Sequence, residues 1–223
     1  VQGYGGRLPD WQDLLKKVQQ TDGVVEAKPL IEQPLLTTYN GRVEAILVRG
    51  MREADMKRND VLGDKVLAGS LAPITPGSEK VALAARLAET LGATVGSRIT
   101  VINPAGRSTP FGTVPREISY EVAAIFEIGI YEFDKAFVVM PLEDAQTLML
   151  MGDDIGMIEV KVDDPDAVSE ILLPIRKDIG PRGVLIDWKT MNASLFDALA
   201  VERVAMFVVL SIIVLVAVFN ILS

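Results

Sequence analysis

Hydrophobic positions divide the chain into a long segment of short elements and one uninterrupted apolar run near its C-terminal end. The run extends from Val204 to Leu222, contains polar side chains only at Ser211 and Asn220, and carries no charge. A helix of this length spans roughly 28 Å, close to the ~30 Å hydrocarbon core of a bilayer. Because the run has no polar face, we predict a transmembrane helix over 204–223; the alternative is a buried core helix of a soluble protein.

The residues just before this run have an amphipathic pattern. From Met191 onward there is neither Gly nor Pro, and an apolar stripe lies opposite polar positions. The stripe contains Leu195, Phe196 and Leu199, and the polar positions are Asp197, Glu202 and Arg203. We predict a coupling helix over 191–203 that continues into the membrane segment, a rod on the order of 50 Å long. The chain is expected to be part of a longer membrane protein.

In the N-terminal half, the hydrophobic pattern predicts helices and strands in an irregular order. Helical spacing begins at Trp11, with Asp10 as its expected N-cap. Residues 24–36 contain two prolines, which favour an edge or irregular strand. Asn40-Gly41 is a strong turn signal and predicts a hairpin that joins 35–39 to 42–48.

The middle and C-terminal parts continue the same pattern. Ser78 is the expected cap of a helix whose apolar face would contain Val81 to Leu91 and which would end at Gly92. Helices are also expected after Pro141 and Pro165. Further strands are predicted over 98–102, 118–126, 136–140, 155–162 and 184–188. Because no strict βαβ repeat is present, the pattern predicts an α+β domain over 1–190 with mixed or antiparallel sheets.

Composition excludes several classes of function. There are 30 acidic against 22 basic residues, a net charge of −8, which argues against nucleic-acid binding. Cysteine and histidine are both absent, which removes thiol chemistry, the commonest general base and the commonest transition-metal ligand. Neither the glycine-rich start nor the 75–80 segment has nucleotide-binding spacing, and the acidic residues over 153–166 lack an EF-hand pattern. We predict no catalytic residues, metal or cofactor.

One segment has an unusual composition for a loop. Residues 103–117, NPAGRSTPFGTVPRE, connect two predicted strands and are apolar where a solvated tip should be polar. Prolines stiffen the segment, which lowers the entropy lost on docking. We predict a projecting arm that enters a hydrophobic cavity of a partner through Thr109, Pro110, Phe111, Gly112, Val114 and Pro115. The alternative is that Phe111 folds back on its own domain.

The arm, Tyr120-Glu121-Val122 and the stretch from Phe137 to Ala145 together resemble the LolC/LolE family of lipoprotein-releasing ABC transporter subunits. The C-terminal block with Glu202-Arg203 and Phe219-Asn220-Ile221 resembles that family's entry into its second transmembrane helix. Leu91-Gly92 and Val95-Gly96 also suit the wider group that includes the macrolide-efflux protein MacB.

This resemblance implies a MacB-like periplasmic domain with a β-hairpin hook, in a permease subunit of the bacterial inner membrane with residues 1–203 on the periplasmic side. Implied partners are a LolA-like periplasmic chaperone held by the hook, a separate LolD-like cytoplasmic ATPase, a second permease subunit in a homo- or heterodimer, and the lipoprotein cargo. Pro110 and Phe111 match the tip of the hook.

A second contact, the family's basic and amide pad, departs from the family pattern. The matching positions are Ile99, Glu117 and Ile118, so Arg98 and Arg116 beside them are the candidate pad residues. The competing hypotheses are a MacB-like efflux or FtsX-like signalling permease subunit, and an extracytoplasmic ligand-sensing domain of a receptor.

Overall fold

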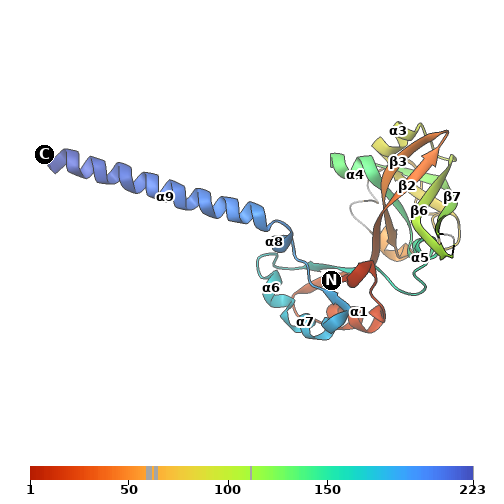
Figure 1. Ribbon diagram of the computed structural model, residues 1–223, viewed down its shortest axis with the longest axis horizontal. Coiled ribbons are helices and arrows are strands. Elements are labelled where there is room, and N and C mark those ends of the chain that lie inside the picture. Colours follow the sequence, from red (N-terminus) through yellow and green to blue (C-terminus); the bar gives the residue numbers. More distant parts are fainter. Residues whose placement is uncertain (59–61, 63–64, 111, 223) are drawn as a thin grey trace. The chain divides into compact units, whose positions relative to one another are not determined.

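The computed structural model describes residues 1–58, 62, 65–110 and 112–222 (Figure 1). The chain divides into two units, Val1–Leu185 and Ile186–Ser223, which we call the sheet unit and the helical unit. The predicted boundaries at 190/191 and 203/204 stay predictions.

The sheet unit contains all the named strands. They are β1 (Gln2–Gly3), β2 (Val24–Tyr39), β3 (Arg42–Met51), β4 (Val66–Gly69), β5 (Lys80–Ala84), β6 (Arg98–Thr109), β7 (Gly112–Phe126), β8 (Phe137–Pro141), β9 (Met157–Val162) and β10 (Gly183–Val184). Its helices are η1 (Tyr4–Gly6), α1 (Trp11–Gln19), α2 (Glu53–Lys57), α3 (Ala85–Leu91), α4 (Tyr131–Ala136), α5 (Leu142–Met149), α6 (Val168–Ile171), α7 (Leu173–Ile179) and η3 (Gly180–Arg182).

The strands form one mixed sheet in the order β10-β1-β9-β2-β3-β8-β5-β7-β4, and β6 bridges β7 back to β2. The strands β2, β3, β8, β5, β7 and β6 therefore pair in a closed ring, because each has a neighbour on both sides. The β3–β8 and β5–β7 pairs are parallel and the others antiparallel. This arrangement confirms the predicted α+β class with mixed sheets.

Two hydrophobic cores hold the sheet unit together. The larger draws side chains from every strand of the ring and from α1, α3, α5 and α7. The smaller packs Met56 of α2 and the side chains of Leu62, Leu71 and Ile74 against β5, β7 and β8, with Phe126 fully buried. Figure 1 shows α1, α6 and α7 gathered at one end of this unit, and α3, β6 and β7 at the other.

The predicted hairpin at Asn40-Gly41 is confirmed and extends further than expected. Tyr39 pairs with Arg42, and the register continues to Leu30 opposite Met51. Asn40 and Gly41 both adopt positive φ, 48° and 79°, as a two-residue turn of type I′ requires.

Strand β2 lies inside the sheet rather than at its edge. It pairs with β9 over its first part, with β3 from Leu30 onward and with β6 from Leu36 to Thr38. Pro29 is therefore matched only by β9, and Pro34 only by β3, among the described residues. A residue without an N–H is tolerated where one side of a strand has no partner.

The helix predicted after Ser78 is wrong in its first part. Residues 80–84 form strand β5, and only Ala85–Leu91 is helical. Ser78 instead accepts a hydrogen bond from the Thr75 amide at 3.2 Å, within a turn. Gly92 ends α3 with φ of 73°, as expected.

The expected helix at Trp11 is confirmed as α1, but Asp10 is not its side-chain cap. Asp10 has a left-handed backbone (φ 48°), and its side chain makes no capping hydrogen bond. The helix after Pro141 is α5, and the predicted helix after Pro165 is divided into α6 and α7. The last predicted strand is shorter, because only Gly183–Val184 pairs, with β1.

The helical unit consists of α8 (Trp188–Met191) and α9 (Ala193–Leu222). Asp187 caps α8 by accepting from the Thr190 amide at 2.6 Å. The predicted continuous helix begins at Ala193, since Asn192 lies between α8 and α9. Within α9, Ala198–Asn220 has a mean hydropathy of 2.5 and is long enough to cross a membrane, and none of it is buried. The Ser211 hydroxyl donates to the Phe207 carbonyl at 2.7 Å, so this polar group is satisfied within the helix.

Candidate functional site

The segment predicted as a long loop is the far end of the β6–β7 hairpin. Beyond Asn103 opposite Arg116, the strands pair again from Arg107 opposite Val114 to Thr109 opposite Gly112. Residues 103–117, which we call the arm, therefore have secondary structure of their own. A paired hairpin is a stiffer projection than a loop of the same length.

The arm presents apolar surface to solvent. Pro110, Gly112, Val114 and Pro115 are exposed, and Val114 keeps 56% of its surface accessible. Thr109 is the last residue of β6 and pairs with Gly112. Phe111, the predicted tip, lies outside the described residues, so its role stays a prediction. Exposed apolar side chains clustered on a projection are typical of a protein-contact element.

The two candidate pad residues are not brought together. Arg98 lies opposite Glu121 at the start of β6, whereas Arg116 lies opposite Asn103 at the base of the arm. Five positions along a strand place them about 16 Å apart. Their pairs also differ by an odd number of positions, so their side chains point to opposite faces of the hairpin.

Their environments differ accordingly. Arg98 is exposed and bonds Glu79 at 3.1 Å. The Nε of Arg116 is buried and has no hydrogen-bond partner among the described residues. They therefore do not form a single basic patch, and a pad role for either residue stays a prediction.

Helix α5 packs against the inner face of this hairpin. Burial raises the pKa of the Tyr120 hydroxyl on β7, and the nearby carboxylate of Asp144 on α5 adds to that shift. Burial also raises the pKa of Asp144, although the hydrogen bond from the Gly77 amide opposes the shift. Because burial is the largest cause in both cases, the shifts reflect tight packing of α5 rather than a pair of groups tuned for proton transfer.

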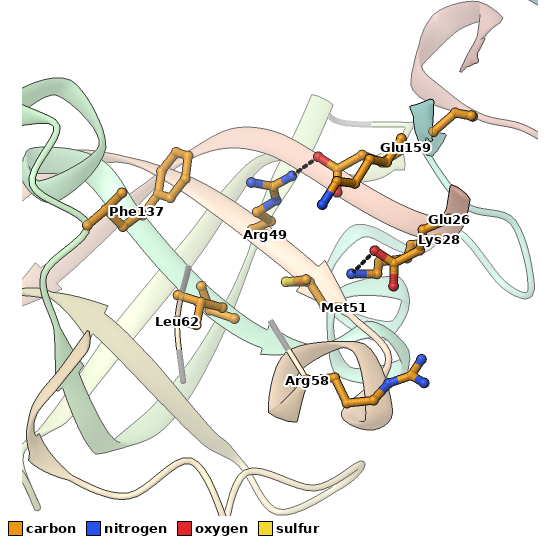
Figure 2. A pocket seen from close by; sticks show the side chains of 12 residues that line it. Glu26, Lys28, Arg49, Met51, Arg58, Leu62, Phe137 and Glu159 are labelled. Carbon is orange, nitrogen blue, oxygen red and sulfur yellow. Dashed lines mark hydrogen bonds and ion pairs between the residues drawn. The ribbon is translucent and has the colours of Figure 1, made fainter. Parts of the chain in front are cut away.

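A separate pocket of about 560 Å³ lies on the face formed by β9, β2, β3 and β8 (Figure 2). Its apolar wall contains Met51, Leu62, Phe137 and Val139. Phe137 stacks on Phe133 with 4.6 Å between ring centroids. Residues from separate strands line this pocket, so no local pattern in the sequence indicated it.

On the polar side of the pocket, Glu26 and Glu159 are each paired with a basic side chain, and Arg58 and Lys161 also line it. Arg49 bonds Glu159 at 2.5 Å and lies 3.6 Å from Glu32, and Lys28 bonds Glu26 at 2.7 Å (Figure 2). Arg49 and Glu32 lie opposite each other on the neighbouring strands β3 and β2, a pairing typical of the solvated face of a sheet. The arm is therefore the stronger candidate site.

The chain belongs to the family of MacB-like periplasmic core domains, which it matches over residues 1–177. Solved structures agree with this fold. The periplasmic region of MacB from Actinobacillus actinomycetemcomitans superposes with a TM-score of 0.52 at 12% identity, covering 82% of this chain and 81% of that one. The extracellular domain of the noncanonic ABC-type transporter YknZ from Gram-positive bacteria gives 0.50 at 15% identity, covering 77% and 85%.

Within this family the chain is similar to LolC, which confirms the resemblance seen in the sequence. It is 31% identical to the lipoprotein-releasing system transmembrane protein LolC of Neisseria meningitidis, over 96% of this chain and 52% of the relative. Identity to LolC of Xylella fastidiosa is 29%, over 100% and 54%. LolE of Haemophilus influenzae is 22% identical, over 96% and 51%. The chain thus spans about half the length of the curated relatives it matches.

Proposed function

We propose that this chain is the periplasmic domain and following membrane helix of a permease subunit in a lipoprotein-releasing ABC transporter of the bacterial inner membrane. The similarity to LolC over nearly the whole chain supports the class of transporter. The apolar span Ala198–Asn220 supports anchoring in the membrane. The subunit itself is non-catalytic, and ATP is hydrolysed by a separate LolD-like chain.

The arm is the proposed contact for a LolA-like periplasmic chaperone. The observation that carries this proposal is an ordered hairpin whose end exposes Pro110, Val114 and Pro115. An apolar, pre-ordered projection can enter a hydrophobic cavity at low entropic cost. Holding the chaperone beside the transporter raises its effective concentration where the lipoprotein leaves the membrane.

Helix α9 is the proposed link to the ATP-driven movement of the permease. It runs from Ala193 to Leu222 without Gly or Pro, so nothing in its sequence favours a kink. A straight helix can transmit a tilt of the membrane segment to residues 193–203. A second permease subunit, identical or different, and the lipoprotein cargo complete the proposed assembly.

The chaperone contact is tested by binding of a purified LolA-type chaperone to the full chain in detergent micelles. Phe111→Glu and Pro110→Gly are expected to weaken binding roughly tenfold or more, as loss of a central apolar anchor does. The matched control is Val43→Glu, which places the same charge on an apolar position beside the other hairpin turn, 59% exposed. Unchanged binding by both arm variants would refute the chaperone contact.

A further inference from the structure

The arm joins its hairpin through an irregular base. Between the pairs Asn103–Arg116 and Arg107–Val114, β6 contains residues 104–106 where β7 contains only Pro115. Extra residues on one strand form a bulge, which bends that strand and increases its twist. The direction of the arm is therefore set at this bulge and not by the regular strands below it.

Asn103 connects the bulge to helix α5. Its side chain is 5% exposed, its Nδ2 donates to the Leu148 carbonyl at 3.2 Å, and its Oδ1 accepts from the Ala105 amide at 3.0 Å. Leu148 is in the last turn of α5, where carbonyls have no partner within the helix. The side-chain amide of Asn103 thus gives a carbonyl at the end of α5 its hydrogen-bond donor and also closes the turn that begins the bulge.

Gly106 allows the two sides of the bulge to close. A Cβ at this position would lie 2.2 Å from the Val114 carbonyl oxygen and 2.7 Å from the Arg116 amide nitrogen. Both neighbours are backbone atoms of the opposite strand, so they cannot move aside without opening the hairpin. Any side chain at 106 would therefore separate the strands at the base of the arm.

Helix α5 is a firm anchor for this base. Ala145 and Leu148 are fully buried in the larger core. At the other end of the helix, the Asp144 carboxylate accepts from the Gly77 amide at 2.8 Å. A residue bonded to this helix is held in the frame of the whole sheet unit.

We infer that Asn103 and Gly106 are positioning residues that hold the arm at one angle to α5, so that it meets its partner pre-aligned. The inference rests on the proposed role of the arm as the chaperone contact. Neither residue needs to touch the partner. Their contribution to affinity is the alignment of the arm before binding, which reduces the entropy lost on association.

Spin-label distances test the alignment directly. The chain has no cysteine, so Thr113→Cys on the arm and Thr147→Cys on α5 would be its only thiols, and both positions are exposed. In the full chain in micelles, pulsed dipolar spectroscopy should give one narrow distance distribution. Asn103→Ala and Gly106→Ala should widen it at least twofold. Asn103→Asp, which keeps the acceptor for Ala105 but loses the donor to Leu148, should widen it too.

Two controls separate alignment from general loosening. Thr100→Ala removes the hydroxyl pair with Ser119, 3.0 Å apart, on the outer face of the same hairpin. Gly156→Ala adds a Cβ whose nearest neighbour is at 3.4 Å, an ordinary contact. Both should leave the distribution as narrow as in the parent. An unchanged width in the Asn103 and Gly106 variants would overturn the inference.

Chaperone affinity supplies the second measurement, with unlabelled chains and a purified LolA-type chaperone. Asn103→Ala, which removes both hydrogen bonds of this side chain, should weaken binding at least about threefold. If Phe111→Glu weakens binding but Asn103→Ala does not, the positioning role is refuted while the chaperone contact stands. If Phe111→Glu and Pro110→Gly have no effect, the chaperone contact fails, and the label distances still decide whether these residues orient the arm.

Discussion

Gly50 on β3 lies directly against Ala145 on α5, and a Cβ added at Gly50 would come within 2.4 Å of the Ala145 Cβ. Ala145 is fully buried, and Gly50 is buried as well. The absence of a side chain at residue 50 therefore determines how closely α5 approaches the sheet. Since Leu148 on the same helix holds Asn103, this approach also sets the base of the arm.

Gly50→Ala is expected to destabilise the chain by about 1–3 kcal/mol, because overpacking a dense core forces neighbouring groups to shift. Thermal unfolding of the full chain in micelles, followed by tryptophan fluorescence, measures the change. The double variant Gly50→Ala with Ala145→Gly should recover part of the loss, even though glycine in a helix costs about 1 kcal/mol. The single variant Ala145→Gly completes the comparison. If the changes in unfolding free energy of the two single variants simply add in the double variant, residues 50 and 145 do not clash.

Asp144 should make stability depend on pH. Burial raises the pKa of its carboxyl above the ordinary value, so the folded chain binds this proton more readily than the unfolded chain does. Its contribution to stability therefore increases as the pH falls from neutral through the raised pKa, and levels off below the ordinary carboxyl value of about 4.

Asp144→Asn removes this dependence, since the amide carries no charge and its oxygen can still accept from Gly77. The stability of the variant relative to the parent should therefore be highest near pH 7 and fall as the solution is acidified. Melting temperatures of the two chains from pH 7 to 4 measure the trend. Glu89→Gln, which removes an exposed charge from α3, is the control. If the stability of Asp144→Asn relative to the parent rises on acidification, the pKa of Asp144 is not raised in the folded chain.

Val209 lies at the middle of the span Ala198–Asn220. If this span crosses the bilayer, Val209→Arg should raise the free energy of insertion by about 2.5–3.5 kcal/mol. Val201→Arg, near the start of the span, should cost less because a long cationic side chain there can reach the interface. Glycosylation-reporter insertion into microsomes measures both variants. Equal effects at the two positions would indicate that the span does not cross the membrane.

Elements whose conformation depends on residues adjacent in the sequence could be predicted from the sequence alone. The Asn40-Gly41 turn requires only two residues that tolerate positive φ, and both adopt it. Helix α9 follows from an apolar run whose length and uniformity need no partner to be recognised. The apolar contact residues of the arm could also be predicted. Its prolines, and apolar residues where a loop tip is usually polar, can be read from the local sequence.

Strand β5 shows where local pattern was insufficient. Residues 81–84 are all apolar, which suits a buried strand or a buried helix equally well. Their conformation is decided by pairing with β7 on one side and β8 on the other, segments about 40 and 55 positions away in the register. The same long-range pairing places the prolines of β2 where one neighbouring strand is absent.

The arm combines both cases. Its apolar residues follow from the sequence alone, since exposure of Pro110 and Val114 needs only a turn and flanking strands. Its paired backbone and its bulge, and the hydrogen bond from Asn103 to Leu148, depend on the position of α5. The pattern of residues 103–117 does not predict that position. Arg98 and Arg116 are both near the arm in the sequence. The register of β6 and β7 nevertheless places their side chains on opposite faces of the hairpin. Local propensity identifies which residues project, but their direction depends on contacts between segments far apart in the chain, which only tertiary packing brings together.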